Sequence, residues 1–209
     1  MPVTINGTTG IVTPAENTST LTVGSTLTVG SITGILKASS GVVSQAVAGT
    51  DYLTSTSGGS ITLAAAQTAS GTSVDFTGIP SWAKRITVMF NGVSLDGANN
   101  ILVRLGAGST PVSSGYTGTS GSWYSAAVGI FISTNGFGIR VSDAAANFTG
   151  CMNIQTIGSN IWISNHSGGG GGYVYGGGSA ITLSGTLDRL TILPTAGNFD
   201  AGTINISYE

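Results

Sequence analysis

Apolar and polar residues alternate along much of the chain from about residue 59 to the C-terminus. The pattern is plain in ITVMF at 86–90 and INISY at 204–208, and turn signals such as Asn91-Gly92, Asp96-Gly97 and Asn135-Gly136 lie nearby. The segments with this pattern are Arg85 to Val93, Ile101 to Leu105, Val128 to Ser133, Phe137 to Val141, Cys151 to Ile157, Ile161 to Ser164, Arg189 to Leu193 and Thr203 to Tyr208. Alternation with a period of two gives each strand one apolar face. We therefore expect residues 59–209 to form an antiparallel, jelly-roll-like β-sandwich.

The first 58 residues have a different pattern. Their apolar residues are mostly Val, Ile and Leu separated by Thr, Ser and Gly, and Tyr52 is their only aromatic residue. STLTVG occurs at 19–24 and again at 25–30. A stretch this thin cannot close a hydrophobic core alone. We expect an extended shaft or attachment segment that assembles with other chains, and the alternative is a linker with two exposed strands.

Composition narrows the class of protein further. Only 7% of the 209 residues are charged, against 40% hydrophobic, and 34 are glycines. Ordinary soluble domains carry about 25% charged residues. Glycine with abundant hydroxyl residues is typical of short strands joined by many turns, so long helices are not expected.

Charge and cysteine usage exclude several kinds of partner. The net charge is −2, and only Lys84 and Arg85 are adjacent among the basic residues, so nucleic-acid binding is not expected. No apolar run approaches the roughly 20 residues needed to span a bilayer, and the N-terminus lacks a signal peptide, so we expect neither membrane insertion nor export by that route. With a single cysteine, Cys151, and a single histidine, His166, we expect no intrachain disulfide, no metal site and no cofactor.

Two stretches carry a family resemblance. TGILK at 33–37, then Gly41 and Val42, then AVAGTDYL at 46–53 resemble a segment that recurs in phage tail fibres. DFTGIPSWAKRITVMF at 75–90 resembles the start of a β-sandwich module of phage tail and fibre proteins. The resemblance implies a virion structural protein made in the host cytoplasm, a homotrimer, and an N-terminal segment upstream of a host-facing domain. Its partners would be a baseplate or tail protein and a receptor on the host surface.

The residues themselves also favour an intertwined homotrimer. The apolar residues of the segment are too sparse for an intrachain core; they are Ile35, Leu36, Val42, Val43, Val47, Tyr52 and Leu53. Threefold association would bury them and cover exposed strand edges. Asp51 is expected to cap a turn or to pair with Lys37 of another chain.

Catalytic chemistry is not expected. The carboxylates away from the chain ends lie in turn-like contexts, where Asp bonds its own backbone, so no carboxylate pair is predicted to face a substrate. His166 has no acid nearby in sequence to orient it as the base of a catalytic triad. We therefore predict a protein that is not an enzyme.

Two aromatic, glycine-rich stretches are the candidate receptor sites. NHSGGGGGYVYGGGS at 165–179 offers Asn165, His166, Tyr173 and Tyr175, and GYTGTSGSWYS at 115–125 offers Tyr116, Trp123 and Tyr124. Tyrosine and tryptophan supply flat amphipathic surfaces that stack on sugars or pack on proteins. We interpret residues 165–179 as a loop that contacts a receptor, packs inside a trimer or is disordered. The low charge favours a glycan receptor, although a protein receptor stays open.

Three functions follow for comparison. The leading one is a phage tail fibre that attaches to a host cell-surface receptor, which we expect to be a glycan. The second is a purely structural virion fibre, or a baseplate or head connector, without receptor binding. The third is a depolymerase-type enzyme, for which the chain offers neither the length nor the paired acids.

Overall fold

The computed structural model describes residues 34–40, 42–48, 50–52, 61–125, 127–141 and 143–209, and the repeat at 19–30 lies outside them. The chain divides into two compact units, Met1–Tyr52 and Leu53–Glu209. The sequence pattern places the corresponding boundary near residue 58. The described residues form strands, turns and bends. None of them lies in a helix long and apolar enough to cross a membrane.

The first unit contains an antiparallel hairpin of β1 (Leu36–Ser39) and β2 (Val42–Gln45). The carboxylate of Asp51 pairs with the Lys37 ammonium at 2.8 Å and accepts the Val47 backbone N–H at 2.8 Å. Asp51 therefore caps a turn, as predicted, while its pairing with Lys37 lies within one chain and not between chains. Several apolar side chains of this unit are 44–55% exposed, namely Ile35, Leu36, Val43 and Val47.

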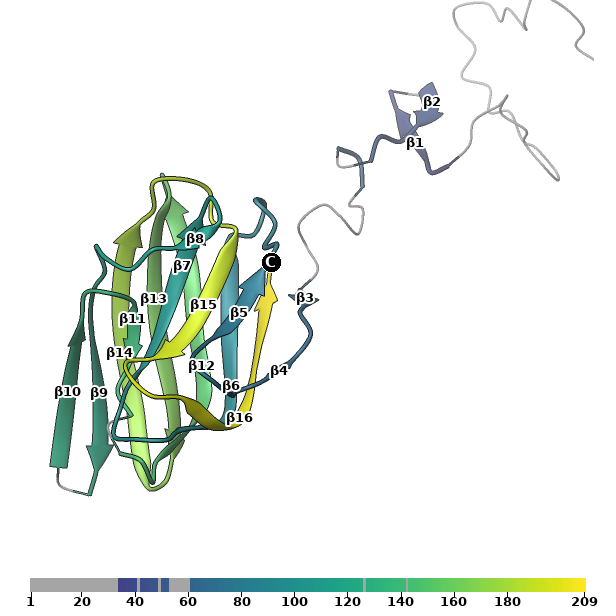
Figure 1. Ribbon diagram of the computed structural model, residues 1–209. Coiled ribbons are helices and arrows are strands. Elements are labelled where there is room, and N and C mark those ends of the chain that lie inside the picture. Colours follow the sequence, from purple (N-terminus) through teal and green to yellow (C-terminus); the bar gives the residue numbers. More distant parts are fainter. Residues whose placement is uncertain (1–33, 41, 49, 53–60, 126, 142) are drawn as a thin grey trace, which may run out of the picture. The chain divides into compact units, whose positions relative to one another are not determined.

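The second unit consists of two antiparallel sheets that face each other as a sandwich (Figure 1). The larger sheet has nine strands in the order β10-β9-β14-β13-β12-β6-β16-β3, with β4 also paired to β16. Its strands are β3 (Thr62–Leu63), β4 (Gln67–Thr68), β6 (Arg85–Leu95), β9 (Thr117–Tyr124), β10 (Ala127–Ser133), β12 (Asn147–Gly158), β13 (Ile161–Gly170), β14 (Tyr173–Thr182) and β16 (Phe199–Tyr208).

The smaller sheet has five strands in the order β11-β7-β15-β5, with β8 paired to β7. Its strands are β5 (Val74–Thr77), β7 (Ile101–Ala107), β8 (Thr110–Pro111), β11 (Phe137–Ile139) and β15 (Arg189–Pro194). Seven of the eight segments predicted from alternation lie wholly on strands, and the eighth, Phe137 to Val141, forms a strand over Phe137–Ile139. The expected all-β, antiparallel, sandwich-like fold is thus confirmed.

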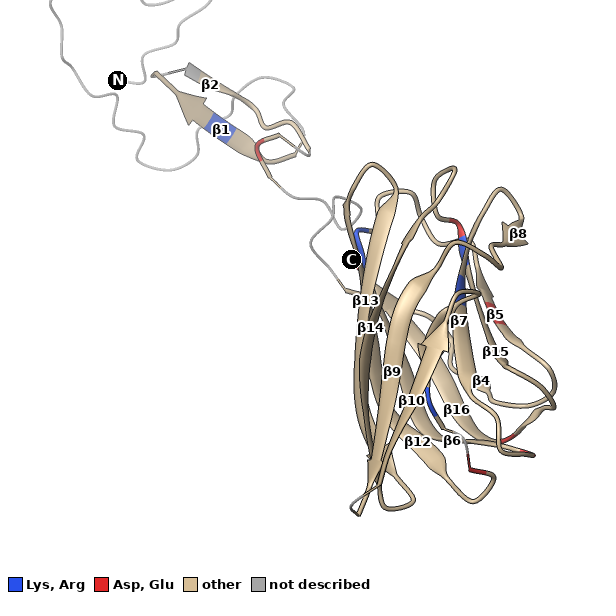
Figure 2. Ribbon diagram, turned by 90° about the vertical axis from the view of Figure 1, so that its left-hand side faces the viewer, with Lys and Arg blue, Asp and Glu red and all other residues tan. Residues whose placement is uncertain are grey.

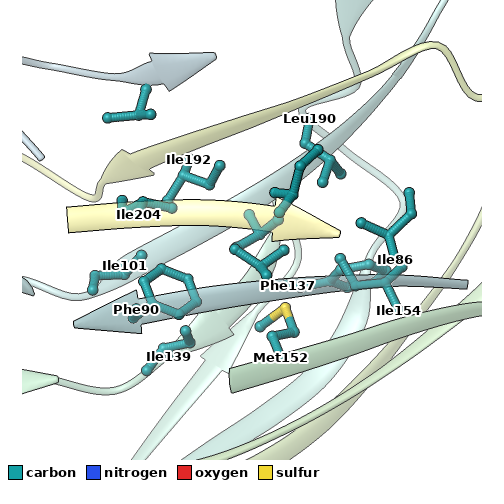
Figure 3. Packing of buried hydrophobic residues seen from close by; sticks show 14 of the residues in the cluster. Ile86, Phe90, Ile101, Phe137, Ile139, Met152, Ile154, Leu190, Ile192 and Ile204 are labelled. Carbon is teal, nitrogen blue, oxygen red and sulfur yellow. The ribbon is translucent and has the colours of Figure 1, made fainter. Parts of the chain in front are cut away.

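The core lies between the two sheets and is filled by the apolar face of each strand. On β6, Ile86, Val88 and Phe90 are at most 3% exposed, and they alternate with more accessible neighbours. Figure 3 shows side chains of this cluster from both layers, including Phe137, Leu190 and Ile192. Because strands such as β6 present large apolar residues at every second position, closing the sandwich removes these side chains from water together.

Strand register defines two ends of the nine-stranded sheet. Thr62 pairs with Tyr208, which pairs with Ile86, so β3 begins at the end that we call the proximal end. Tyr124, the last residue of β9, and Tyr173, the first residue of β14, lie at the opposite or distal end. This separation places the aromatic residues of β9 and β14 far along the strands from the point where β3 starts (Figure 1).

The prediction of a loop at residues 165–179 is wrong. These residues lie on the β13–β14 hairpin, whose two central residues, Gly171 and Gly172, have φ of 57° and 84°. Positive φ at both positions is the requirement of a type I′ hairpin turn, which glycine meets without strain. Most of the predicted connection at 115–125 is likewise strand β9. The glycine-rich stretches therefore build the sheet rather than project from it.

Candidate functional site

A stack of aromatic rings runs from the core to the surface at the distal end. Phe148 and Tyr175 meet edge to face at 5.3 Å, Tyr175 stacks on Tyr173 at 5.8 Å, and Tyr173 stacks on Tyr124 at 4.7 Å between ring centroids. Phe148 and Tyr175 are buried, Tyr173 is half-buried, and Tyr124 is 50% exposed. The stack therefore presents Tyr124 and Tyr173 to solvent on a buried aromatic base.

Hydrogen bonds fix the outer part of this stack. The Tyr173 hydroxyl donates to the Asp143 carboxylate at 2.8 Å, and Asp143 also accepts the Ala145 backbone N–H at 3.0 Å. The bond from Ala145, followed by the bond from Tyr173, lowers the pKa of Asp143. The same contact with Asp143 raises the pKa of Tyr173. Tyr173 is consequently a neutral, oriented donor at ordinary pH.

A pocket of about 180 Å³ opens beside these rings. It is lined by Ser122, Tyr124, Ala127, Val128, Gly129, Arg140 and Tyr173. Arg140 follows β11 and reaches the larger sheet, where its Nε donates to the Ser122 hydroxyl at 3.1 Å and its Nη1 donates to the Ile130 carbonyl at 3.2 Å. The guanidinium is therefore held in place at the wall of the pocket.

His166 is buried between the two sheets and does not reach this pocket's lining. It is 4% exposed, and its Nε2 lies 3.0 Å from the Ser120 hydroxyl oxygen. Burial lowers the pKa of His166 to about 4, so the imidazole is neutral at pH 7. Its surroundings are those of a structural hydrogen-bonding residue inside the sandwich.

The predicted receptor residues fall into three groups. Tyr124 and Tyr173 lie together at the distal end, whereas Tyr116, His166 and Tyr175 are buried. The Tyr116 hydroxyl accepts the Leu105 N–H at 2.8 Å, and burial raises the pKa of both Tyr116 and Tyr175 to about 12. The remaining two, Trp123 and Asn165, lie on the outer face of the larger sheet.

Arg140 was not among the residues predicted for this site. Its sequence context, between Ile139 and Val141 in an alternating segment, indicates a strand residue that points away from the core. The only local signal is that it is one of six basic residues in the chain. Its approach to Ser122 depends on how the two sheets pack, which no local pattern reveals.

The outer face of β10, β9 and β14 carries exposed apolar side chains. On β10, Val128, Ile130 and Ile132 are 62%, 64% and 73% exposed. Val128 pairs with Trp123, which pairs with Val174, so these three residues form one row across the strands. We call these five residues, Trp123, Val128, Ile130, Ile132 and Val174, the apolar face. Figure 2 shows that β9, β10, β13 and β14 bear no Lys, Arg, Asp or Glu.

Glycines flatten this face beside Trp123. A Cβ on Gly121 would lie 3.0 Å from the indole ring, and one on Gly176 would lie 3.6 Å from it. The indole thus extends over Gly121 and Gly176 while remaining 45% exposed. The result is a flat, uncharged surface of a kind that packs against another flat surface.

A larger pocket of about 430 Å³ lies toward the proximal end. Half of its ten lining residues carry a hydroxyl or amide side chain; the lining consists of Ser81, Ala83, Lys84, Thr156, Gly158, Ser159, Asn160, Trp162, Thr186 and Leu187. No carboxylate lines it, and the exposed aromatic rings Tyr124 and Tyr173 lie at the other end of the sheet. Size alone therefore does not make it the better candidate for recognition.

Within the described residues, no group of three or more His, Cys, Asp and Glu side chains could hold a metal ion. Comparisons with protein-family models, with curated proteins and with solved structures found no match for this chain. The candidate site consequently rests on its own geometry: two exposed tyrosines, a fixed arginine and a small pocket at the distal end.

Proposed function

We propose that this chain is a phage tail-fibre protein that attaches to a glycan on the host cell surface through its distal end. The observation that carries the proposal is the exposed Tyr124–Tyr173 stack at the end of the sandwich opposite the start of β3. In this arrangement the N-terminal segment joins a baseplate or tail protein. The far end of the sandwich then meets the cell.

The chemistry of the distal end supports a glycan as the receptor. Sugars present C–H faces that pack on aromatic rings, and hydroxyls that exchange hydrogen bonds with neutral polar groups. Tyr124 offers a half-exposed ring, and Tyr173 offers a ring and an oriented hydroxyl. Ser122 adds a further hydroxyl in the pocket wall. Because the base of the stack is buried, these groups are positioned before the ligand arrives, which lowers the entropic cost of binding.

The apolar face supports assembly into a homotrimer. Exposed aliphatic side chains in a row on a sheet commonly mark an interface. An identical, uncharged face on a second copy matches it without leaving a charge unpaired. The same argument applies to the exposed apolar residues of the N-terminal hairpin. In this proposal Trp123 serves assembly rather than receptor contact.

A role without catalysis is part of the proposal. Asp96 accepts hydrogen bonds from Asn198, Asp143 from Tyr173, and Asp188 from Arg189 and two backbone N–H groups. Each carboxylate is thereby occupied in holding a turn or a neighbouring side chain. Glycoside hydrolysis would instead need two carboxyl groups facing each other across a substrate cleft.

The test measures binding of the labelled full chain to a panel of bacterial strains that differ in surface polysaccharide, with particle mass determined by light scattering on the same sample. We expect a trimer that binds some strains and not others, and at least tenfold weaker binding for Tyr124→Ala and Tyr173→Ala. Trp82→Ala is the matched control, because Trp82 is 40% exposed and its ring packs, tilted, against that of Tyr208 at the proximal end.

Three results would contradict parts of the proposal. A trimer that binds no strain would favour the alternative, a purely structural fibre or a baseplate or head connector. Equal loss of binding in Trp82→Ala and Tyr124→Ala would show that the distal end has no special role. A monomer would contradict the fibre architecture itself.

A further inference from the structure

Arg140 is a half-buried cation without a carboxylate partner among the described residues. The ion pairs of the described chain are Lys37 with Asp51, Arg85 with Glu209, and Arg189 with Asp188. Arg140 instead donates to a serine hydroxyl and a backbone carbonyl, which leave its positive charge uncompensated. A guanidinium held in this way is well prepared to accept an anionic group.

The backbone of β10 leaves room for this guanidinium. A Cβ added to Gly129 would lie 2.1 Å from Nε and 2.5 Å from Nη2 of Arg140. Any side chain at position 129 would therefore displace the arginine from its place. Gly129 pairs with Ser122 across β10 and β9, so one row of the sheet supplies both the space and a hydrogen-bond acceptor for Arg140.

The pocket gives the cation a defined setting. Arg140 is the one charged residue in its lining, and the rings of Tyr124 and Tyr173 stand beside it. The nearby acid Asp143 already accepts hydrogen bonds from Tyr173 and Ala145. A volume of about 180 Å³ is smaller than the roughly 300–1,000 Å³ typical of pockets for drug-sized ligands. It suits a single unit of a chain whose remainder lies in solvent.

We infer that this pocket binds an acidic sugar unit of a surface polysaccharide. The carboxylate of the sugar pairs with the Arg140 guanidinium, and the sugar ring packs on Tyr124. This inference rests on the proposed function and specifies its ligand class. Arg140 then distinguishes acidic from neutral polysaccharides, whereas Tyr124 contributes to the binding of either.

The experiment uses the full chain and two probes, a hexuronic-acid oligosaccharide and its carboxyl-reduced counterpart, in calorimetric titrations and as inhibitors of cell binding. We expect the acidic form to bind at least tenfold more tightly, with an affinity that falls as salt rises. Arg140→Gln and Gly129→Ala should abolish the preference, Arg140→Lys should reduce it, and Tyr124→Ala should weaken both forms.

Arg104→Gln is the matched control, because Arg104 likewise donates to a backbone carbonyl, from its Nε to that of Asn135, and has no carboxylate partner in the described chain. Thermal unfolding of each variant shows whether the fold persists, and Arg140→Lys keeps the charge if Arg140→Gln is destabilised.

The outcomes separate the two proposals. Equal affinity for the two oligosaccharides, or no inhibition of cell binding by the acidic form, would overturn the acidic-sugar inference while leaving attachment through the distal end in place. Cell binding by folded Arg140→Gln at the level of the unmodified chain would overturn it as well. Absence of binding to every strain would overturn the proposed function, and the inference would fall with it.

Discussion

His166 on β13 and Ser120 on β9 are hydrogen-bonded across an intervening strand. Their side-chain atoms Nε2 and Oγ are 3.0 Å apart, and Gly177 of β14 lies between them in the sheet. The Ser120 oxygen accepts the Arg140 backbone N–H at 2.8 Å, and its own proton is available to donate to Nε2. An imidazole nitrogen accepts a hydrogen bond only when the ring is neutral. The contact therefore ties the protonation of His166 to the stability of the sandwich.

We predict that mild acid destabilises the protein through His166. The pKa of His166 is about 4 in the folded chain, below its ordinary 6.5, so the unfolded chain binds more protons between these values. The stabilisation is complete above pH 6.5 and is lost as the pH falls toward 4. We expect a loss of about 2 kcal/mol between pH 7.5 and 5, measured by urea unfolding.

His166→Asn supplies the control for this measurement. The variant should be less stable at pH 7.5 and should lose much less stability on going to pH 5, since the carboxylates with lowered pKa titrate mainly below that range. An identical pH dependence in the two proteins would show that another group is responsible.

Gly177 should tolerate no side chain. A Cβ there would lie 2.6 Å from the His166 ring and 2.4 Å from the Thr119 carbonyl oxygen. We expect Gly177→Ala to cost about 1–3 kcal/mol in the free energy of unfolding, the usual cost of overpacking. At Gly176 the nearest atom would be 3.6 Å away, so Gly176→Ala should be neutral or slightly stabilising. Equal effects at the two positions would rule out the steric explanation.

Charges on the apolar face should weaken self-association. Ile130→Lys and Ile132→Lys place an ammonium where the proposed interface buries an aliphatic side chain. Association would then remove the ammonium from water, which is unfavourable. We expect a lower particle mass by light scattering over a range of concentrations, with unchanged circular dichroism. Ile157→Lys is the control, because Ile157 is 64% exposed but lies outside this face. Unchanged mass in the two β10 variants would exclude the face from assembly.

Removing the Tyr173 hydroxyl should raise the pKa of Asp143. The Ala145 N–H remains as a donor to the carboxylate, so the pKa should rise toward its ordinary value without fully reaching it. A carboxyl-detected NMR titration of Tyr173→Phe would measure the change, with Asp188 as an internal reference. No movement of the Asp143 pKa would indicate that the hydroxyl does not contact it in solution.

Sequence patterns predicted the strands in which large apolar and polar residues alternate, whether the apolar side chains fill the core, as in β6, or lie on the outer face, as in β10. β9 and β14 were missed because their inward positions include Ser120, Ser122 and Gly177, over which Arg140 and His166 extend from elsewhere. Small inward residues remove the period-two contrast on which a strand prediction depends. Only the packing of neighbouring strands and of the second sheet explains why these positions are small.

Asn91-Gly92 illustrates a second limit. The pair reads as a hairpin turn, but it lies within β6 at a bulge opposite β12, where the register shifts between Phe148 and Gly150. Gly92 has a φ of 61°, and its N–H donates to the Thr149 hydroxyl at 2.9 Å. Turns and bulges need the same positive φ, so the local sequence cannot distinguish them.

The candidate site was predicted in part. Tyr124 and Tyr173 were among the candidates because exposed aromatic residues in polar surroundings suit recognition, and the structure brings their rings together. Burial of Tyr175 and His166 depends on strand parity within a hairpin that the sequence presents as a loop. Tyr116 precedes β9 and is buried through its edge-to-face contact with Phe137 of the smaller sheet. Arg140 joins the site only through contact between the sheets.

The pairing of β3 with β16 has a mechanical consequence. Tension applied to the chain before Ile61, with the distal end held by a receptor, would pull β3 and β4 along their own axes. Antiparallel hydrogen bonds run across the strands. The bonds of Thr62–Leu63 and Gln67–Thr68 to β16, together with the Gly71–Phe199 bridge, would therefore share the load in shear rather than open one after another. A fibre anchored in this way would hold its tip during the pull between virion and cell.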